Sequence, residues 1–245
     1  SAFLILKCMV HESGSIRLDL RNLGINKEKF IKIVQIGLPA SLQGVIFSLS
    51  NVVIQSSVNS FGEITVAGNS AAANIEGFVY VAMNSLYQAA ISFTGQNVGA
   101  GKYERVNRIL YTAEACVIVV GLVLGNGALF FGKQLLSIYT ENPDVIDAGM
   151  KRVGVMALAY CISAFMDCTI AASRALGKSL VPMFIVIMGS CVFRVVWVYT
   201  VFAYFKTIPS LYLLYVFSWT ITAIAEIIYF LHVYRGIFPK ANAVA

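Results

Sequence analysis

The feature that most restricts the fold of this chain is a series of six long apolar segments separated by short polar breaks. Each segment is longer than the roughly 20 residues that cross a hydrocarbon core about 30 Å thick. Only 12% of the residues are charged, whereas a soluble domain carries about 25%. The sequence therefore predicts an all-α polytopic membrane protein, a bundle of six transmembrane helices. These helices are expected at about residues 31–59, 65–98, 105–131, 148–173, 180–205 and 211–235.

The residues outside the six helices divide the chain further. Residues 1–11 are apolar but too short to span a membrane, so we expect them to be the tail of a truncated preceding transmembrane helix. Residues 12–30 are polar and rich in Lys and Arg, which is typical of a linker. The six-helix region then covers residues 31–238, and residues 239–245 form a short tail.

Lys and Arg are unevenly distributed between the two ends of the predicted bundle. Six crossings place the linker and the C-terminus on one side, which carries 12 of the 18 basic residues. The opposite side carries four, Lys133, Lys151, Arg152 and Lys206, and two more lie within helices. Because loops rich in Lys and Arg stay in the cytoplasm, the linker and the C-terminus are predicted to be cytoplasmic.

A few charged residues remain inside the predicted membrane spans. Each costs roughly 2.5–3.5 kcal/mol near the bilayer centre on insertion scales, so we expect them to face the bundle interior or an aqueous cavity. Arg194 is expected near mid-membrane, with Asp167 or Glu226 as its counter-ion. The sequence leaves two roles open for Arg194: a permanent ion pair that fixes helix packing, or a pair that breaks and re-forms as a switch. The five residues are Glu76, Glu114, Asp167, Arg194 and Glu226.

Polar and aromatic residues recur at helical spacing on four of the predicted helices. At about 100° per residue, each set falls within an arc of about 60–80° on its helix. Such faces can enclose a wet cavity that binds amphipathic or cationic solutes, although polar faces also join helices by hydrogen bonds. The sets are Ser41, Ser48, Asn51 and Gln55; Glu76, Tyr80, Asn84 and Tyr87; Tyr160, Ser163, Asp167 and Arg174; and Tyr215, Trp219, Thr222 and Glu226.

These faces and the intramembrane charges together supply candidate substrate- and ion-binding residues, because ionisable groups within the membrane are usually functional. The candidates are Asp167, Glu76, Glu226, Arg194, Asn51, Gln55, Tyr80, Asn84 and Tyr160. Pro39 removes a backbone hydrogen bond within the first long helix and is a candidate hinge.

No catalytic or cofactor-binding motif is found in the sequence. The five cysteines lie in apolar segments and lack metal-ligand spacing. The net charge of +6 follows the membrane topology and does not indicate nucleic-acid binding. We therefore expect a protein that is not an enzyme and has no catalytic residue, cofactor, metal or nucleic-acid partner. Its expected partners are the lipid bilayer and a small-molecule substrate.

Four short motifs occur in order along the chain. A turn with Gly95, Gln96, Gly99 and Ala100 closes the second long helix on the predicted cytoplasmic side. The other motifs are Gly37-Leu38-Pro39, Ala67-Gly68-Asn69, and the segment 174–179 (Arg-Ala-Leu-Gly-Lys-Ser) followed by Pro182. In order and spacing these motifs resemble those of the multidrug and toxic compound extrusion (MATE) family, and the resemblance covers nearly the whole chain.

The resemblance implies a fold and an activity. MATE proteins have twelve helices in two six-helix lobes, and this chain resembles the second lobe, with the interlobe linker at residues 12–30. It would then be half of a secondary active transporter in the plasma membrane, with the N-terminal lobe of the same full-length chain as its partner. The implied activity is export of organic cations or amphipathic drugs in exchange for H⁺ or Na⁺.

Transfer of the coupling residues from the family is incomplete. Sodium-coupled members use acids on the first and fourth helices of this lobe, whereas the first helix here has no acid and the fourth has Asp167. Which ion couples therefore stays open. Two other functions are alternatives: a lipid-linked oligosaccharide flippase of the same superfamily, which predicts a more basic cavity, and a non-transporting membrane scaffold subunit.

Overall fold

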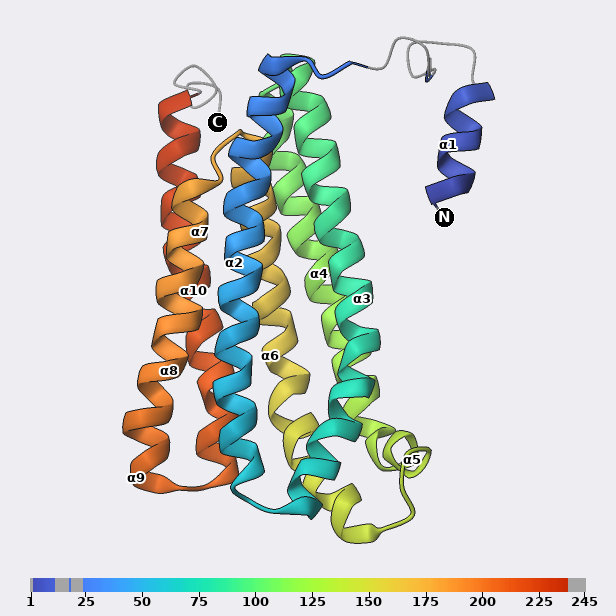
Figure 1. Cartoon of the computed structure of the whole chain (residues 1–245), viewed down its shortest axis with the longest axis vertical. Coiled ribbons are helices and arrows are strands. Elements are labelled where there is room, and N and C mark those ends of the chain that lie inside the picture. Colours follow the sequence, from blue (N-terminus) through green and yellow to red (C-terminus); the bar gives the residue numbers. More distant parts are fainter. Residues whose placement is uncertain (1, 12–17, 19–23, 238–245) are drawn as a thin grey trace.

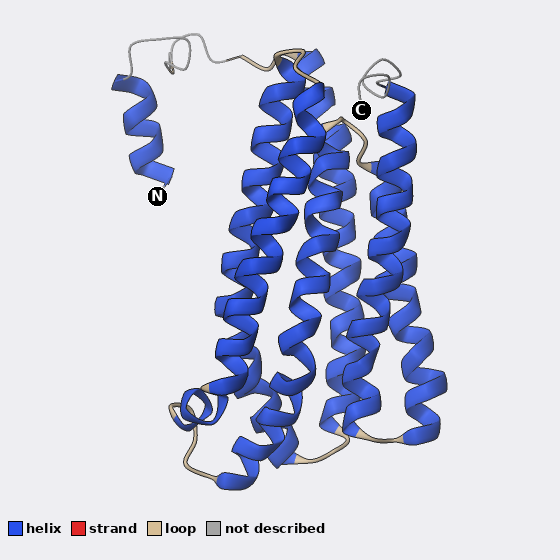
Figure 2. Cartoon of the chain, turned by 180° about the vertical axis from the view of Figure 1, so that it is seen from behind, coloured by secondary structure: helices blue, strands red, loops and turns tan. Residues whose placement is uncertain are grey.

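The computed structural model describes residues 2–11, 18 and 24–237 of the chain. Within these residues, six long helices run alongside one another as an up-and-down bundle (Figure 1). The described residues contain helices and loops but no strand (Figure 2). The predicted fold class, an all-α bundle of six helices, is confirmed.

Each long helix coincides closely with one predicted span. They are α2 (Lys27–Asn59), α3 (Glu63–Gly99), α4 (Glu104–Phe130), α6 (Pro143–Ala175), a composite helix over 180–205, and α10 (Ile208–Ile237). Two short helices, α1 (Ala2–His11) and α5 (Gly132–Ser137), complete the fold. Most of the predicted linker, at 12–17 and 19–23, and the predicted tail at 239–245 lie outside the described residues.

Four of the long helices are long and apolar enough to cross a membrane: Lys27–Asn59, Glu104–Phe130, Leu180–Phe205 and Ile208–Gly236. A fifth is α6, if its halves Pro143–Ala157 and Ala159–Ala175, bent by 43° relative to each other, form one span. The 37 residues of α3 exceed the length required. This helix is less apolar because polar side chains such as Asn69 and Glu76 face the bundle interior, where they are buried.

The fifth long helix is not a regular α-helix. Its segments are α7 (Leu180–Val186), a π-helical turn (Ile187–Val192), α8 (Phe193–Trp197), a second π-helical turn (Val198–Phe202) and α9 (Ala203–Phe205). Turns of this type are rare and frequently mark functional sites. Arg194 lies in α8, between the two π-helical turns, and the sequence pattern did not indicate this irregularity.

The turn motif found in the sequence ends α3 in a Schellman geometry. The N–H of Lys102 donates to the Asn97 carbonyl at 2.9 Å and that of Gly101 to the Val98 carbonyl at 3.1 Å. Gly101 has φ +71°, a conformation that glycine adopts without steric cost. The end of α6 repeats this arrangement, with Gly177 at φ +77°. Both turns lie at the bundle end shared by α2's start and the end of α10 (Figure 1).

Close helix contacts in the bundle depend on glycine. A Cβ on Gly125 of α4 would lie 2.4 Å from the carbonyl oxygen of Ala157 on α6. A Cβ on Gly68 of α3 would lie 2.6 Å from the carbonyl oxygen of Val145, also on α6. Small residues at helix interfaces let the backbones approach closely in a membrane. Helix α6 therefore packs closely against α3 on one side and against α4 on another.

We predict that Gly125→Ala destabilises the full-length protein by about 1–3 kcal/mol, the usual cost of overpacking a tight site. Thermal unfolding in detergent measures this as a lower Tm. Gly127→Ala is the matched control, because a Cβ there meets nothing within 4 Å and alanine favours a helix by about 1 kcal/mol over glycine. Equal Tm values for the two variants would contradict the close approach of α4 to α6.

Candidate functional site

A cavity of about 680 Å³ lies within the bundle, lined by residues of α2, α3, α6, α7 and α10. Its wall combines aromatic side chains with acids, amides and a basic residue, which suits a solute with both apolar and charged parts. The polar side chains that line it are Gln43, Ser48, Asn51, Gln55, Asn69, Glu76, Tyr80, Arg152, Tyr160, Ser163, Asp167, Tyr215 and Trp219.

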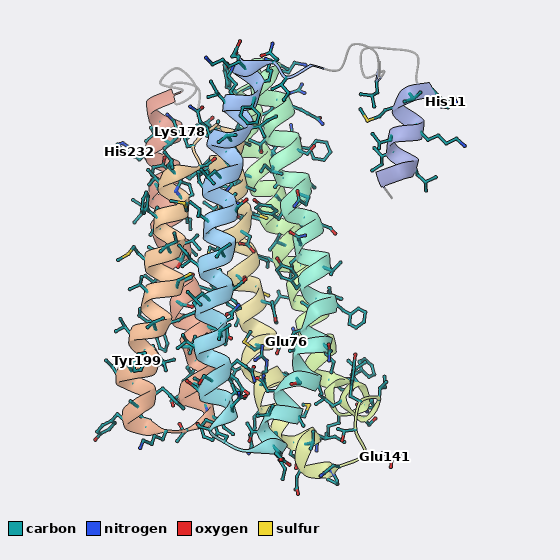
Figure 3. The ribbon with its side chains drawn as sticks, in the orientation of Figure 1. His11, Glu76, Glu141, Lys178, Tyr199 and His232 are labelled. Carbon is teal, nitrogen blue, oxygen red and sulfur yellow. The ribbon has the colours of Figure 1, made fainter. Side chains whose placement is uncertain are left out.

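The strongest polar interaction in the cavity is a bidentate ion pair. Arg152 of α6 donates from Nε to Glu76 Oε1 at 2.8 Å and from Nη2 to Glu76 Oε2 at 2.7 Å. The two side chains are only 11% and 7% exposed. Tyr160 donates its hydroxyl to Glu76 Oε2 at 2.9 Å. Figure 3 shows Glu76 between the helices, in the half of the bundle away from Lys178.

Asn69 extends this ion pair into a network across four helices. Its Oδ1 accepts from Arg152 Nη1 at 2.6 Å and from the Tyr212 hydroxyl at 3.0 Å. Its Nδ2 donates to Gln55 Oε1 at 3.2 Å. Because Gln55 belongs to α2, Asn69 to α3, Arg152 to α6 and Tyr212 to α10, the network fixes these four helices relative to one another.

Arg152 lies within the predicted helix at 148–173, but its place near the start of that helix groups it with the basic residues of the side opposite the linker and not with the charges inside the bundle. In the structure it lies in α6 and forms the buried ion pair with Glu76, which was not predicted. The neighbouring Lys151 is exposed, and two adjacent basic residues near a helix end are typical of an exposed surface. A usable signal was present, because Arg152, Tyr160, Ser163 and Asp167 fall within about 80° on one helix face.

Arg194 is fully buried next to the cavity and is surrounded by aromatic rings. Its guanidinium carbon lies 4.6 Å from the ring centroid of Phe47, 4.7 Å from that of Tyr215 and 5.4 Å from that of Trp219. Its Nε donates to Ser218 Oγ at 3.1 Å, whereas Nη2 has no hydrogen-bond partner in the part of the chain that the structure describes. Cation–π attraction is strongest where the cation is desolvated.

The predicted counter-ion of Arg194 is absent from its surroundings. Among the described residues, neither Asp167 nor Glu226 lies within ion-pairing distance of it. Arg194 Nη1 donates instead to Asn51 Oδ1 at 3.3 Å. This oxygen and the three aromatic rings occupy the position expected for a carboxylate. The prediction is wrong because a helical pattern places Arg194 on a face but does not identify the residues opposite.

Asp167 lines the cavity from α6, one turn beyond Ser163. No hydrogen bond or ion pair joins its carboxylate to another described side chain, so it is available to a solute or an ion. Arg174, two turns further along the helix, donates to the Tyr87 hydroxyl at 2.8 Å and to Gln43 Oε1 at 2.7 Å. This bridge joins α6 to α2 and α3 beside Gln43, which also lines the cavity.

Two further acids are buried away from the cavity. Glu114 of α4 accepts from the Thr169 hydroxyl at 3.1 Å through Oε1, while its Oε2 has no partner among the described residues. Glu226 of α10 is 0% exposed, and within the same described part of the chain neither of its oxygens has a hydrogen-bond partner. With Glu76 and Arg194 also buried and Asp167 in the cavity wall, the expectation that all five intramembrane charges avoid lipid is confirmed.

The structure brings together six of the nine predicted binding residues. Asn51, Gln55, Glu76, Tyr80, Tyr160 and Asp167 all line the cavity. Arg194 and Glu226 are fully buried and do not line it, and Asn84 is exposed. Sequence reasoning missed Arg152 and Asn69, although Asn69 lies on the same face of α3 as Glu76, two turns earlier.

The remaining predicted features are located as follows. Pro39 is buried within α2, which continues through it, and its role as a hinge stays a prediction. Across residues 2–11, 18 and 24–237, no group of three or more His, Cys, Asp and Glu side chains is arranged to hold a metal ion.

Comparisons with known proteins agree on one family. The family model described as MatE matches residues 39–200. The probable multidrug resistance protein YoeA of Bacillus subtilis is 24% identical over 69% of this chain and 36% of its own length. An FAD transporter of Shewanella oneidensis is 25% identical over 64% of this chain and 34% of its own.

Solved structures share the fold. A crystal structure of MATE in complex with MaL6 superposes with a TM-score of 0.86 at 17% identity, covering 98% of this chain and 54% of that one. The chain thus spans about a third of the curated relatives named above and about half of this solved chain. All of these relatives are transporters and not enzymes, as the sequence predicts.

We predict that Arg152→Gln destabilises the full-length protein by about 3–5 kcal/mol, because it leaves the buried Glu76 carboxylate without its partner. The measurement is thermal unfolding in detergent. The control is Lys133→Gln. In the wild-type protein Lys133 Nζ lies 3.8 Å from Asp147 Oδ1, and the two side chains are 71% and 67% exposed. Exposed pairs contribute about 0–1 kcal/mol. A destabilisation by Arg152→Gln no greater than that of the control would contradict the central role of the ion pair.

Proposed function

The chain belongs to the MatE family of transporters, the multidrug and toxic compound extrusion (MATE) family, and we propose that it forms one lobe of an efflux transporter for amphipathic and cationic organic compounds. The observation that supports this most directly is the cavity of about 680 Å³ with Asp167 in its wall. Outward movement of the compound would be driven by inward movement of H⁺ or Na⁺.

Substrate recognition is proposed to combine aromatic contact with one uncommitted acid. Tyr80, Tyr160, Tyr215 and Trp219 line the cavity, and aromatic rings attract organic cations. The acid Glu76 is already engaged by Arg152, whereas Asp167 forms no hydrogen bond or ion pair with another described side chain. Asp167 is therefore the acid best placed to meet a cationic group or the coupling ion.

We propose that H⁺ and the cationic substrate compete for Asp167. A single carboxylate carries one negative charge, and binding of either a proton or a cationic group neutralises it. Once one of them is bound, the other has no charge left to bind. Na⁺ would serve in the same way through the oxygen ligands of Asp167 and neighbouring amides. The family membership does not distinguish the two ions for this chain.

The partner of this lobe is proposed to be a second six-helix lobe facing α2. In the 18-residue apolar stretch of α2 that could cross a membrane, only 6% of the residues are buried, whereas 50% are buried in the corresponding stretch of α10. A polar series that includes Gln43, Ser48, Asn51 and Gln55 runs along this little-buried helix and into the cavity. An N-terminal lobe of the same full-length chain would cover it, with the linker and C-terminus on the cytoplasmic side.

A flippase for lipid-linked oligosaccharides is less well supported. That function predicts a cavity with excess positive charge, whereas here the cationic Arg152 is matched by Glu76, and Asp167 adds an acid. A scaffold subunit would have no need of an uncommitted acid in a cavity of this size.

We predict that Asp167→Asn in the full-length protein abolishes gradient-driven efflux, because the amide can neither exchange a proton nor neutralise a cationic group. Dye efflux from proteoliposomes with an imposed H⁺ or Na⁺ gradient measures this. Asp147→Asn is the matched control, since Asp147 lies on the same helix and is exposed. Undiminished efflux by Asp167→Asn would remove Asp167 from the mechanism.

We also predict that this lobe, reconstituted alone in proteoliposomes, shows no drug–ion exchange, because its cavity would lack the opposite wall. The same vesicles containing the full-length protein are the positive control. Robust exchange by the lobe alone would overturn the two-lobe proposal.

A further inference from the structure

A second concave site lies on the outside of the bundle, between α3 and α4. It has a volume of about 500 Å³ and is separate from the central cavity, with which it shares no lining residue. Its lining residues are Leu86, Ala89, Ala90, Phe93 and Asn97 on α3, and Arg105, Arg108, Ile109, Thr112, Ala113 and Cys116 on α4. We refer to this surface as the α3–α4 groove.

The charges of the α3–α4 groove are confined to one end. Arg105 and Arg108 belong to the first turns of α4, immediately after the loop that follows α3 (Figure 1). Both are exposed, and neither guanidinium forms a hydrogen bond or ion pair with any described residue. Glu104 precedes them but does not line the groove. Two uncommitted guanidinium groups at this position fit an anionic oxygen-rich group.

The remainder of the groove is lined mainly by apolar side chains. Three alanines, Ala89, Ala90 and Ala113, leave space between the helices, and Leu86, Phe93 and Ile109 border it. Asn97 and Thr112 each donate one hydrogen bond to a backbone carbonyl of their own helix. The floor is therefore mainly apolar and offers contact chiefly to hydrocarbon.

The length of the groove matches one leaflet of a bilayer. Its lining runs from residue 86 to 97 on α3 and from 105 to 116 on α4, which is about 16 Å on each helix at 1.5 Å per residue. This is about half of a hydrocarbon core roughly 30 Å thick. An acyl chain that lies along the alanines would thus place its headgroup beside Arg105 and Arg108.

We propose that the α3–α4 groove is a binding site for an anionic phospholipid of the leaflet at the basic end of the bundle. The phosphate and the further acidic or hydroxyl groups of the headgroup bind Arg105 and Arg108, and one acyl chain occupies the apolar floor. Basic pockets between transmembrane helices are suited to anionic headgroups, and bidentate guanidinium contacts favour phosphate. A zwitterionic lipid would satisfy the floor but bring a positive group to the two arginines.

The test is native mass spectrometry of the purified full-length protein with phosphatidylglycerol and phosphatidylcholine of identical acyl chains. We expect tighter binding of phosphatidylglycerol, and Arg105→Gln/Arg108→Gln lowers that affinity by about 25-fold, since each basic residue near the surface contributes about fivefold. Phosphatidylcholine binding is expected to change little. The matched control is Lys102→Gln/Lys178→Gln, which removes the same charge from exposed positions at the same end of the bundle (Lys178 in Figure 3).

A second variant separates lipid from free phosphate. Ala89→Phe fills the apolar floor and keeps both arginines, so we expect it to weaken phosphatidylglycerol binding, while glycerol 3-phosphate fails to displace the lipid from the wild-type protein. Unchanged Tm values for all variants establish that they are folded. The proposal is overturned if the arginine variant binds phosphatidylglycerol as the lysine control does. It is overturned equally if Ala89→Phe has no effect or glycerol 3-phosphate displaces the lipid.

Discussion

The arrangement of the cavity depends on the ion pair between Glu76 and Arg152. Both groups are nearly excluded from solvent, and a buried charge is tolerated only where its partner and its hydrogen bonds are all supplied. Arg152 meets this requirement with two bonds to Glu76 and one to Asn69, and Tyr160 completes the shell of Glu76. Because these residues belong to α3 and α6, the electrostatic requirement fixes the relative position of two of the three helices that supply most of the cavity lining, the third being α2.

The backbone contacts beside this network serve the same end. Gly68 lets α3 approach the start of α6, and Gly125 lets α4 approach the middle of α6. Without a hydrophobic driving force between helices in lipid, such close packing and interhelical hydrogen bonds are what hold a bundle together. Close backbone contacts therefore join α3, α4 and α6. Polar side chains join α2 to its neighbours: Gln43 accepts from Arg174 of α6, Gln55 accepts from Asn69 of α3, and Asn51 accepts from Arg194 of α8.

The charged residues of the bundle interior have distinct surroundings. Glu76 is neutralised by Arg152, and Arg194 is held by aromatic rings and neutral oxygens. Asp167 alone among the five intramembrane charges faces the cavity without a partner, which is why the transport proposal rests on it. On the outer surface, Arg105 and Arg108 are also uncommitted, but there the neighbouring floor is apolar, so the ligand that we propose for them is an anionic lipid.

The sequence by itself determined the six helices, their boundaries to within a few residues, the glycine-containing turn that ends α3, and the interior position of the intramembrane charges. It did so because the apolar runs, the 3.6-residue period and left-handed glycine conformations are local properties. It also placed Asn51, Gln55, Glu76, Tyr80, Tyr160 and Asp167 on faces that meet at the cavity.

Only the tertiary structure decided which side chains meet across helices. Arg152 binds Glu76, a pair that the sequence did not predict, and Arg194 binds no acid, against the sequence expectation. Glu226 lies outside the cavity wall. Periodicity orients a residue about the axis of its own helix, but its partner depends on how far neighbouring helices are rotated and shifted along their axes. Those rotations and shifts are set by long-range packing, through contacts such as those of Gly68 and Gly125 with α6.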